Sequence, residues 1–240
     1  MPITFYGSRS QTAKTSGTTL VMDLSAAPKV NVGSLLVICF AHDVAAGTYS
    51  VADTQGHTYR PDFEADFGSN LGVHIWSTIS TFTGFINVTI THPTLTARAA
   101  FGVTLDGASQ ALTGTKGSAT GTSTSPSSPS LTPAVDGAAV FGFVGREGPG
   151  ITDAAFTNDA AYAAGTLASP GTTGGSGASN ISGGLGVLVQ GTAAATTYDA
   201  TLGASVDWLA VAIAYGPDAA SIPPRGVRAT LQAVNRASTY

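Results

Sequence analysis

The side chains that could perform chemistry are few and lie far apart along the chain. Four histidines are present: His42, His57, His74 and His92. No two of them have the spacing of metal ligands on one element, and there is no cysteine pair to complete a zinc site. His42-Asp43 could be combined with a serine into a Ser-His-Asp triad, but no GxSxG motif marks a nucleophile. His57, beside a turn, and His92, before a proline, are expected to be exposed.

Carboxylates give an equally weak catalytic signal. Glycosidases need two of them in different environments, and the chain has only two glutamates, Glu64 and Glu147. Glu64 belongs to the acidic segment 62–66, for which we favour a solvated loop over a weak cation site or an interface. Glu147 follows Arg146, and this pair is expected to face solvent or a neighbouring chain. No EF-hand loop and no phosphate-binding loop is present, so we expect no enzyme, no metal and no cofactor.

Aromatic side chains offer the remaining binding chemistry, because rings with a polar handle often form binding surfaces. Trp76 and Trp208 are the main candidates for stacking on a carbohydrate, with Tyr49 and Tyr59 as further candidates. Each tryptophan lies within or at the edge of an expected strand with apolar neighbours, so we favour packing in the core or an interface. The single cysteine, Cys39, lies in an apolar run and is expected to be a small buried side chain.

Composition excludes several classes of function. The 240 residues include 10 Lys and Arg against 14 Asp and Glu, and 10% of positions are charged, compared with about 25% in ordinary domains. Ten scattered cations form no basic stripe, so no nucleic acid partner is expected. The longest apolar run, 35–41, is far shorter than the ~20 residues that span a bilayer, and the first residues do not resemble a secretory signal. We therefore expect no membrane association.

Short β-branched and aromatic segments separated by turn residues predict an all-β fold. Segment 34–42 is continuously apolar and is expected to be buried on both faces, whereas 71–79 has two differently filled sides. In 85–91, Ile86, Val88 and Ile90 should point inward, and Pro93 should end the strand. Asp-Thr-Gln-Gly at 53–56 predicts a tight turn between two short strands at 48–51 and 57–59. Further strands are expected at 18–24, 99–105, 138–144, 181–189, 196–202 and 206–215.

These segments add up to roughly ten to twelve strands, which predicts an antiparallel β-sandwich of jelly-roll type, with two stacked sheets, over residues 18–216. Segment 114–133 is expected to be a long surface connection or an edge strand, 145–179 to be mostly loop with its most flexible part at 170–177, and the glycines at 183–186 to mark a bulge or a close backbone approach. Extended arms are expected at 1–17 and, after a stiff linker, at 217–240. The expected assembly arm carries Pro223, Pro224, Arg225, Arg228, Arg236 and Tyr240.

Three segments together resemble a known class of proteins. They are VGSLLV at 32–37, SVADTQGHTY at 50–59 and DWLAVAIA at 207–214, with a Ser/Thr/Pro-rich middle between the last two. The chain resembles β-sandwich modules in structural proteins of tailed bacteriophages and in bacterial surface proteins, over most of residues 18–216. Related modules often have Asn after the turn glycine, where this chain has His57. The resemblance implies no catalytic residues.

The resemblance implies a non-enzymatic virion structural protein that is assembled in the host cytoplasm. We expect a homo-oligomeric capsid decoration protein that binds and stabilises the particle surface, with copies of itself and major capsid or tail proteins as partners. The absence of coiled-coil heptads favours a capsid decoration protein over the alternative of a tail or fibre-associated protein. A second alternative is a carbohydrate-binding adhesin module that contacts a host surface glycan through the aromatic residues.

Overall fold

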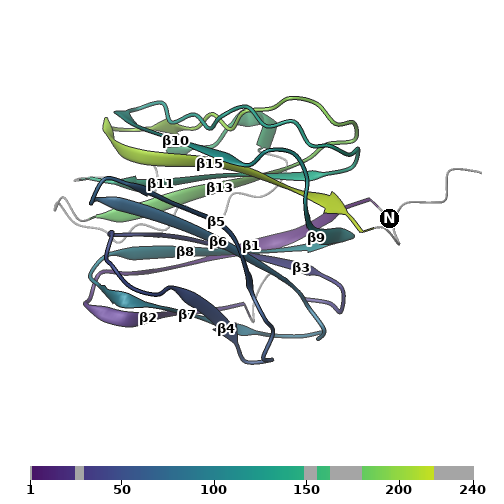
Figure 1. Cartoon of the computed structure of the whole chain (residues 1–240), viewed down its shortest axis with the longest axis horizontal. Helices are drawn as coiled ribbons and strands as arrows, with labels where there is room; N and C mark the ends of the chain where they lie inside the picture. Colours follow the sequence, from purple (N-terminus) through teal and green to yellow (C-terminus); the bar gives the residue numbers. More distant parts are fainter. Residues whose placement is uncertain (1, 25–29, 149–155, 163–179, 219–240) are drawn as a thin grey trace, which may run out of the picture.

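The computed structural model describes residues 2–24, 30–148, 156–162 and 180–218, and it is an all-β, antiparallel structure (Figure 1). The strands form three layers instead of the two expected. A five-stranded middle sheet lies between a three-stranded lower sheet and a four-stranded upper sheet to which a fifth strand is added. The extra layer explains why so many strands are apolar along their whole length, because a sheet that is covered on both faces has no solvent side.

The middle sheet has the order β1-β8-β3-β6-β5. Its strands are β1 (Thr4–Ala13), β8 (Arg98–Asp106), β3 (Leu35–His42), β6 (Leu71–Ile79) and β5 (Arg60–Phe67). Every residue of β3 is buried, as expected for 34–42. In β6, Val73 and Ile75 face the upper core while His74 and Trp76 face the other way, so its two sides are filled differently. The expected N-terminal arm is not observed, because β1 pairs with β8 from Thr4 to Ala13.

The lower sheet has the order β2-β7-β4, with β2 at Gly17–Asp23, β7 at Asn87–Leu95 and β4 at Ser50–Asp53. Ile86, Val88 and Ile90 are buried as expected. Pro93 does not end β7, which continues to Leu95. The pairing with β4 stops at Thr91, and the register with β2 shifts between Gly17 and Thr19, so the missing N–H of Pro93 interrupts no regular ladder.

The upper sheet has the order β10-β15-β11-β13, with β9 also paired to β15. These strands are β10 (Gly117–Ser123), β15 (Val206–Pro217), β11 (Ala139–Glu147), β13 (Ile181–Val189) and β9 (Ala108–Leu112). β10 is therefore the edge strand that was one of the two expectations for 114–133. Of the expected strand at 196–202, only β14 (Thr201–Leu202) is regular, paired with β12 (Phe156–Thr157).

Glycines on the outer face of the upper sheet allow rings to lie directly on the backbone. A Cβ on Gly142 would be 2.0 Å from Cγ of Tyr198, and one on Gly184 would be 2.0 Å from Cζ of Phe156. Gly186 is approached by Cβ of Tyr162, the last residue of a short 3-10 helix (Ala160–Tyr162). The glycines at 183–186 thus mark a close backbone approach, and β13 keeps a regular register with β11 without a bulge. The expected flexible part at 170–177 lies outside the described residues.

Candidate functional site

The middle and lower layers enclose a pocket that contains residues from both the aromatic and the acidic candidates. Its volume is about 320 Å³, and we call it the Tyr49–Trp76 pocket. It is lined by Gly47, Thr48, Tyr49, Pro61, Glu64, His74 and Trp76. Tyr49 and Trp76 are two of the four aromatic residues expected from the sequence. The other two, Tyr59 and Trp208, are not in its lining.

Strand pairing explains how the lining is assembled. His74 and Trp76 are two residues apart on β6 and therefore share one face of the sheet. On the edge strand β5, Glu64 pairs with His74 and Pro61 pairs with Trp76. The segment that precedes β4 supplies Tyr49. The His74 ring lies between its neighbours, 5.1 Å and 8° from the Trp76 ring and 4.3 Å and 27° from the Tyr49 ring, measured between centroids and planes.

Two polar side chains of the pocket make no hydrogen bond to the described part of the protein. They are His74, which is 5% exposed, and Trp76, which is 4% exposed. The carboxylate of Glu64 is 3.9 Å from Nδ1 of His74, which is too long for a hydrogen bond. Burial lowers the pKa of His74 to about 4, so its ring is neutral at pH 7, with one nitrogen donating and the other accepting.

The ring stack continues from the pocket into the lower core. Tyr49 stacks on His42, His42 on Phe40, and Phe40 on His92. His92 is 3% exposed, so the expectation of an exposed side chain is wrong; β7 continues past Pro93 and keeps His92 inside. Burial lowers the pKa of His92, and it lowers the pKa of His42 to about 3. Because Nδ1 of His42 lies 2.6 Å from the carbonyl oxygen of Asp43, Nδ1 carries the proton.

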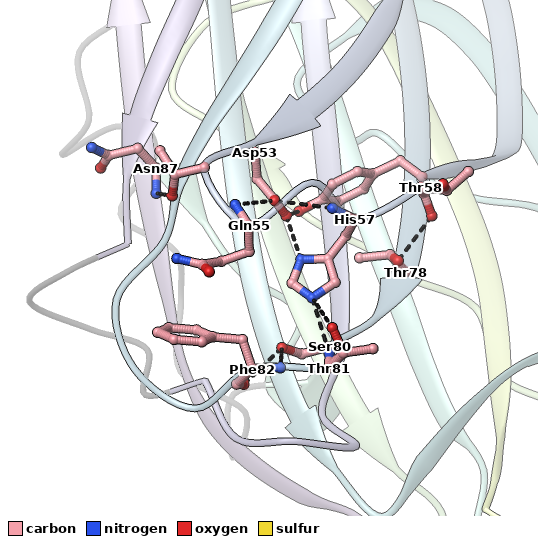
Figure 2. A network of polar contacts seen from close by, with 11 residues as sticks. Asp53, Gln55, His57, Thr58, Thr78, Ser80, Thr81, Phe82 and Asn87 are labelled. Carbon is pink, nitrogen blue, oxygen red and sulfur yellow. Dashed lines mark hydrogen bonds and ion pairs between the residues drawn. The ribbon is translucent and has the colours of Figure 1, made fainter.

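A second polar cluster is centred on Asp53, in the turn that the sequence predicts (Figure 2). Oδ1 of Asp53 accepts hydrogen bonds from the backbone N–H groups of Gln55 and His57, at 2.9 and 3.2 Å. Oδ2 accepts from Nδ1 of His57 and from the hydroxyl of Tyr59, both at 2.8 Å. The side chain of His57 is only 3% exposed, so the expectation that it is exposed is also wrong. These bonds fix the turn between β4 and β5.

The Asp53 cluster has the outline of a catalytic triad, because Nε2 of His57 lies 3.1 Å from the hydroxyl of Thr81. The backbone N–H of Thr81 also points at Nε2, at 2.9 Å. An N–H can only donate, so the lone pair of Nε2 is already engaged by the contact drawn in Figure 2. The proton is therefore on Nδ1, which donates to Asp53. A histidine in this state cannot remove a proton from the hydroxyl, and the cluster is structural.

A third site places the second glutamate in a pocket. This pocket of about 310 Å³ is lined by Asn70, Thr122, Glu147, Gly148, Ser205, Val206 and Asp207. Glu147 on β11 pairs directly with Asp207 on β15. The sequence did not predict this pair, because the two residues are far apart along the chain. Asp207 accepts hydrogen bonds from Thr122 (2.5 Å) and Asn70 (3.1 Å). Burial and the charges of Asp43 and Asp207 raise the pKa of Glu147 to about 7.

The remaining candidates are structural. Trp208 is 8% exposed and donates its indole N–H to Ser123, which agrees with the favoured interpretation of packing. Cys39 is fully buried, and burial raises the pKa of its thiol. The acidic segment 62–66 is not a solvated loop but part of β5. Within it, Asp62 is buried and accepts a hydrogen bond from Tyr215, while Glu64 lines the Tyr49–Trp76 pocket, so these carboxylates do not form one site.

Charged Arg146 also faces the interior, against the expectation of a surface pair with Glu147. Its side chain is fully buried, donates to the hydroxyl of Ser182 and lies over the ring of Phe156. The expected arm residues Pro223, Pro224, Arg225, Arg228, Arg236 and Tyr240 lie outside the described residues.

Within the described ranges, no group of three or more His, Cys, Asp or Glu side chains is placed to hold a metal ion. No helix in the same ranges has the length and apolar character needed to cross a membrane. No protein-family model, no curated protein and no solved structure matches this chain.

Proposed function

We propose that the chain is a non-enzymatic structural protein of a tailed-phage virion, and specifically a capsid decoration protein that binds and stabilises the particle surface. It would assemble in the host cytoplasm as a homo-oligomer, in contact with copies of itself and with a major capsid or tail protein. A tail or fibre-associated location is the alternative. The proposal is based on the sequence resemblance and on the strand order of the first eight strands.

That strand order supports the jelly-roll type. In a jelly roll of eight strands, strands 1-8-3-6 form one sheet and face strands 2-7-4-5 in the other. Here β1-β8-β3-β6 face β2-β7-β4, and only β5 differs, because it pairs with β6. Jelly rolls recur in viral capsid domains and in lectins. The upper sheet then lies on the jelly roll as a third layer.

The residues that carry the resemblance also support a structural role. Segment 32–37 leads into the fully buried β3, and segment 207–214 lies within β15, whose residues 208–214 are all buried. Segment 50–59 forms β4 and the turn that Asp53 holds closed (Figure 2). These segments build sheets and a turn, and their polar groups are used in holding the chain in place.

The test is co-sedimentation with particles produced from the genome that encodes the chain. The full chain is compared with a shorter one that ends at Asp218, because the N–H of Asp218 still bonds to Gly107 and the cut leaves β15 intact. We expect the full chain to sediment with capsids, and the shorter one to remain in the supernatant with an unchanged unfolding midpoint. Light scattering should give a discrete oligomer.

Three outcomes would change the proposal. Equal capsid occupancy by the shorter chain would eliminate the arm as the anchor. Immunogold labelling on tails alone would favour the tail or fibre-associated alternative. Absence of the full chain from purified particles would overturn the virion role itself.

A further inference from the structure

We propose that the Tyr49–Trp76 pocket binds one unit of an uncharged saccharide. Two polar side chains that are more than nine-tenths buried, His74 and Trp76, line this pocket without hydrogen-bond partners among the described residues. The side-chain nitrogens of both residues are accessible to solvent, since neither is among the fully covered atoms without a partner, and both residues line the pocket. The neutral ring of His74 and the indole of Trp76 can therefore form hydrogen bonds to a ligand in the pocket.

The hydrogen-bonding capacity of the lining fits hydroxyl groups. The indole of Trp76 can only donate, the carboxylate of Glu64 can only accept, and the neutral imidazole of His74 can do both. A hydroxyl both donates and accepts, so one hydroxyl can bond to His74 and Glu64 across the 3.9 Å that separates them. A saccharide presents several such groups around a ring. The hydroxyl of Tyr49 is already used, since it donates to the carbonyl of Ala45 at 2.9 Å.

Charge in and around the pocket selects against anionic sugars. Glu64 is the only charged residue in the lining, and its side chain is 69% exposed. Asp66 adds a second negative charge close by: burial raises the pKa of Tyr49, and the charges of Asp66 and Glu64 raise it further. No Lys or Arg lines the pocket to offset them. A uronic acid, a sialic acid or a phosphorylated sugar would therefore be repelled.

Size and shape limit the ligand to a short one. About 320 Å³ is near the lower end of the range of small-molecule pockets, which favours a terminal sugar over an extended chain. The lining also offers apolar surface, from Pro61 and from the rings of Tyr49 and Trp76. A sugar ring has the same combination of apolar C–H groups and hydroxyls.

The two tryptophans provide an internal control for a binding experiment by NMR. Trp76 lines the pocket and its indole N–H makes no hydrogen bond to the described residues, whereas the indole N–H of Trp208 is bonded to Ser123 in the upper sheet. The full chain is titrated with glucose, galactose, rhamnose and N-acetylglucosamine, and in parallel with glucuronic and galacturonic acid. We expect at least one neutral sugar to shift the Trp76 indole signal saturably, with no shift of the Trp208 signal and no response to the acids.

Two matched substitutions test the residues. Glu64→Gln removes the charged acceptor from an exposed position and should weaken binding by about tenfold or more, since a hydrogen bond to a charged group contributes about 1.5–3 kcal/mol. Glu147→Gln makes the same change at the only other glutamate, in the other pocket, and should leave the affinity unchanged.

Three results would overturn the saccharide site: no shift of the Trp76 signal with any neutral sugar, equal binding of the neutral and acidic sugars, or equal affinity of Glu64→Gln and the unchanged protein. The site does not depend on the location of the chain on a particle. Sugar binding without co-sedimentation would support this proposal and overturn the virion role. Co-sedimentation without sugar binding would overturn this proposal and support the virion role.

Discussion

Asp53 is the residue with the greatest number of specific contacts in the turn between β4 and β5. Burial by itself raises the pKa of this carboxyl, but hydrogen bonds from His57, Tyr59 and two backbone N–H groups outweigh burial and hold the pKa below its usual value. The carboxylate form is thus favoured by folding. Its contribution to stability is present above the pKa of the unfolded chain and is lost as the pH falls through the lower folded value.

Replacing Asp53 by alanine should lower the free energy of unfolding by about 2–4 kcal/mol at pH 7, because four hydrogen bonds to one carboxylate are lost together and His57 is left without its acceptor. Urea unfolding measures the change. Asp136→Ala is the matched control, since Asp136 accepts one hydrogen bond, from the N–H of Ala193, and should cost about 1 kcal/mol or less. Equal losses in the two variants would contradict the role assigned to Asp53.

At the scale of the element, the ring stack ties β3, β6 and β7 to the segment that precedes β4. Three of its rings are histidines whose pKa values are lowered by burial: His42 to about 3, His74 to about 4, and His92 in the same direction. Because the folded pKa is below the unfolded value of 6.5, the unfolded chain takes up protons first as the pH falls. Stability from these groups is complete above about pH 6.5 and decreases toward the folded pKa values.

The free energy of unfolding of the His74→Gln variant should therefore depend less on pH than that of the unchanged protein. Between pH 6.5 and 4, the free energy of unfolding of the unchanged protein minus that of the variant should change by up to about 1.4 kcal/mol per pH unit, which is the effect of one proton. Measuring the difference between the two proteins removes the opposite contribution of Glu147, whose pKa is raised to about 7 and which gains stability on acidification. Parallel pH profiles would show that His74 does not titrate as described.

The sequence predicted the elements well where one local pattern was decisive. The buried β3, the inward residues of 86–90 and the turn at 53–56 all follow from apolar runs, alternation and turn residues. The third layer was not predictable, because a strand covered on both faces has the same pattern whichever sheets cover it. The pocket was missed as a unit for a similar reason: Glu64 comes beside His74 and Trp76 only through the pairing of β5 with β6, and Tyr49 reaches them from the segment before β4 by stacking on His74.

At the scale of the whole molecule, the middle sheet contributes to two cores. Phe101 and Val37 face the upper core with Phe143, whereas Phe40 and Trp76 face the lower core with Met22. Neither outer sheet can bury its inner face without the middle one. We infer that the three layers unfold as a single cooperative unit.

Substitutions in either core should therefore shift one common unfolding transition. Phe143→Ala in the upper core should cost about 3–5 kcal/mol and Met22→Ala in the lower core about 2–5 kcal/mol, because each side chain is fully buried. Val21→Ala, next to Met22 but 52% exposed, is the control and should change stability by about 0.5 kcal/mol or less. Calorimetry should show one peak in every variant. Two separate peaks in either core variant would show that the layers unfold independently.

The pairing of β1 with β8 also sets the order of events during synthesis. Thr4 pairs with Asp106, so about a hundred more residues must be synthesised after β1 before its partner strand β8 is complete. The upper sheet forms later still, because β10 and β11 both pair with β15, which is the final strand described. At the usual rate of about 5–20 residues per second, the nascent chain exposes unpaired strands for many seconds, and its yield in a cell should depend on chaperones that hold such chains.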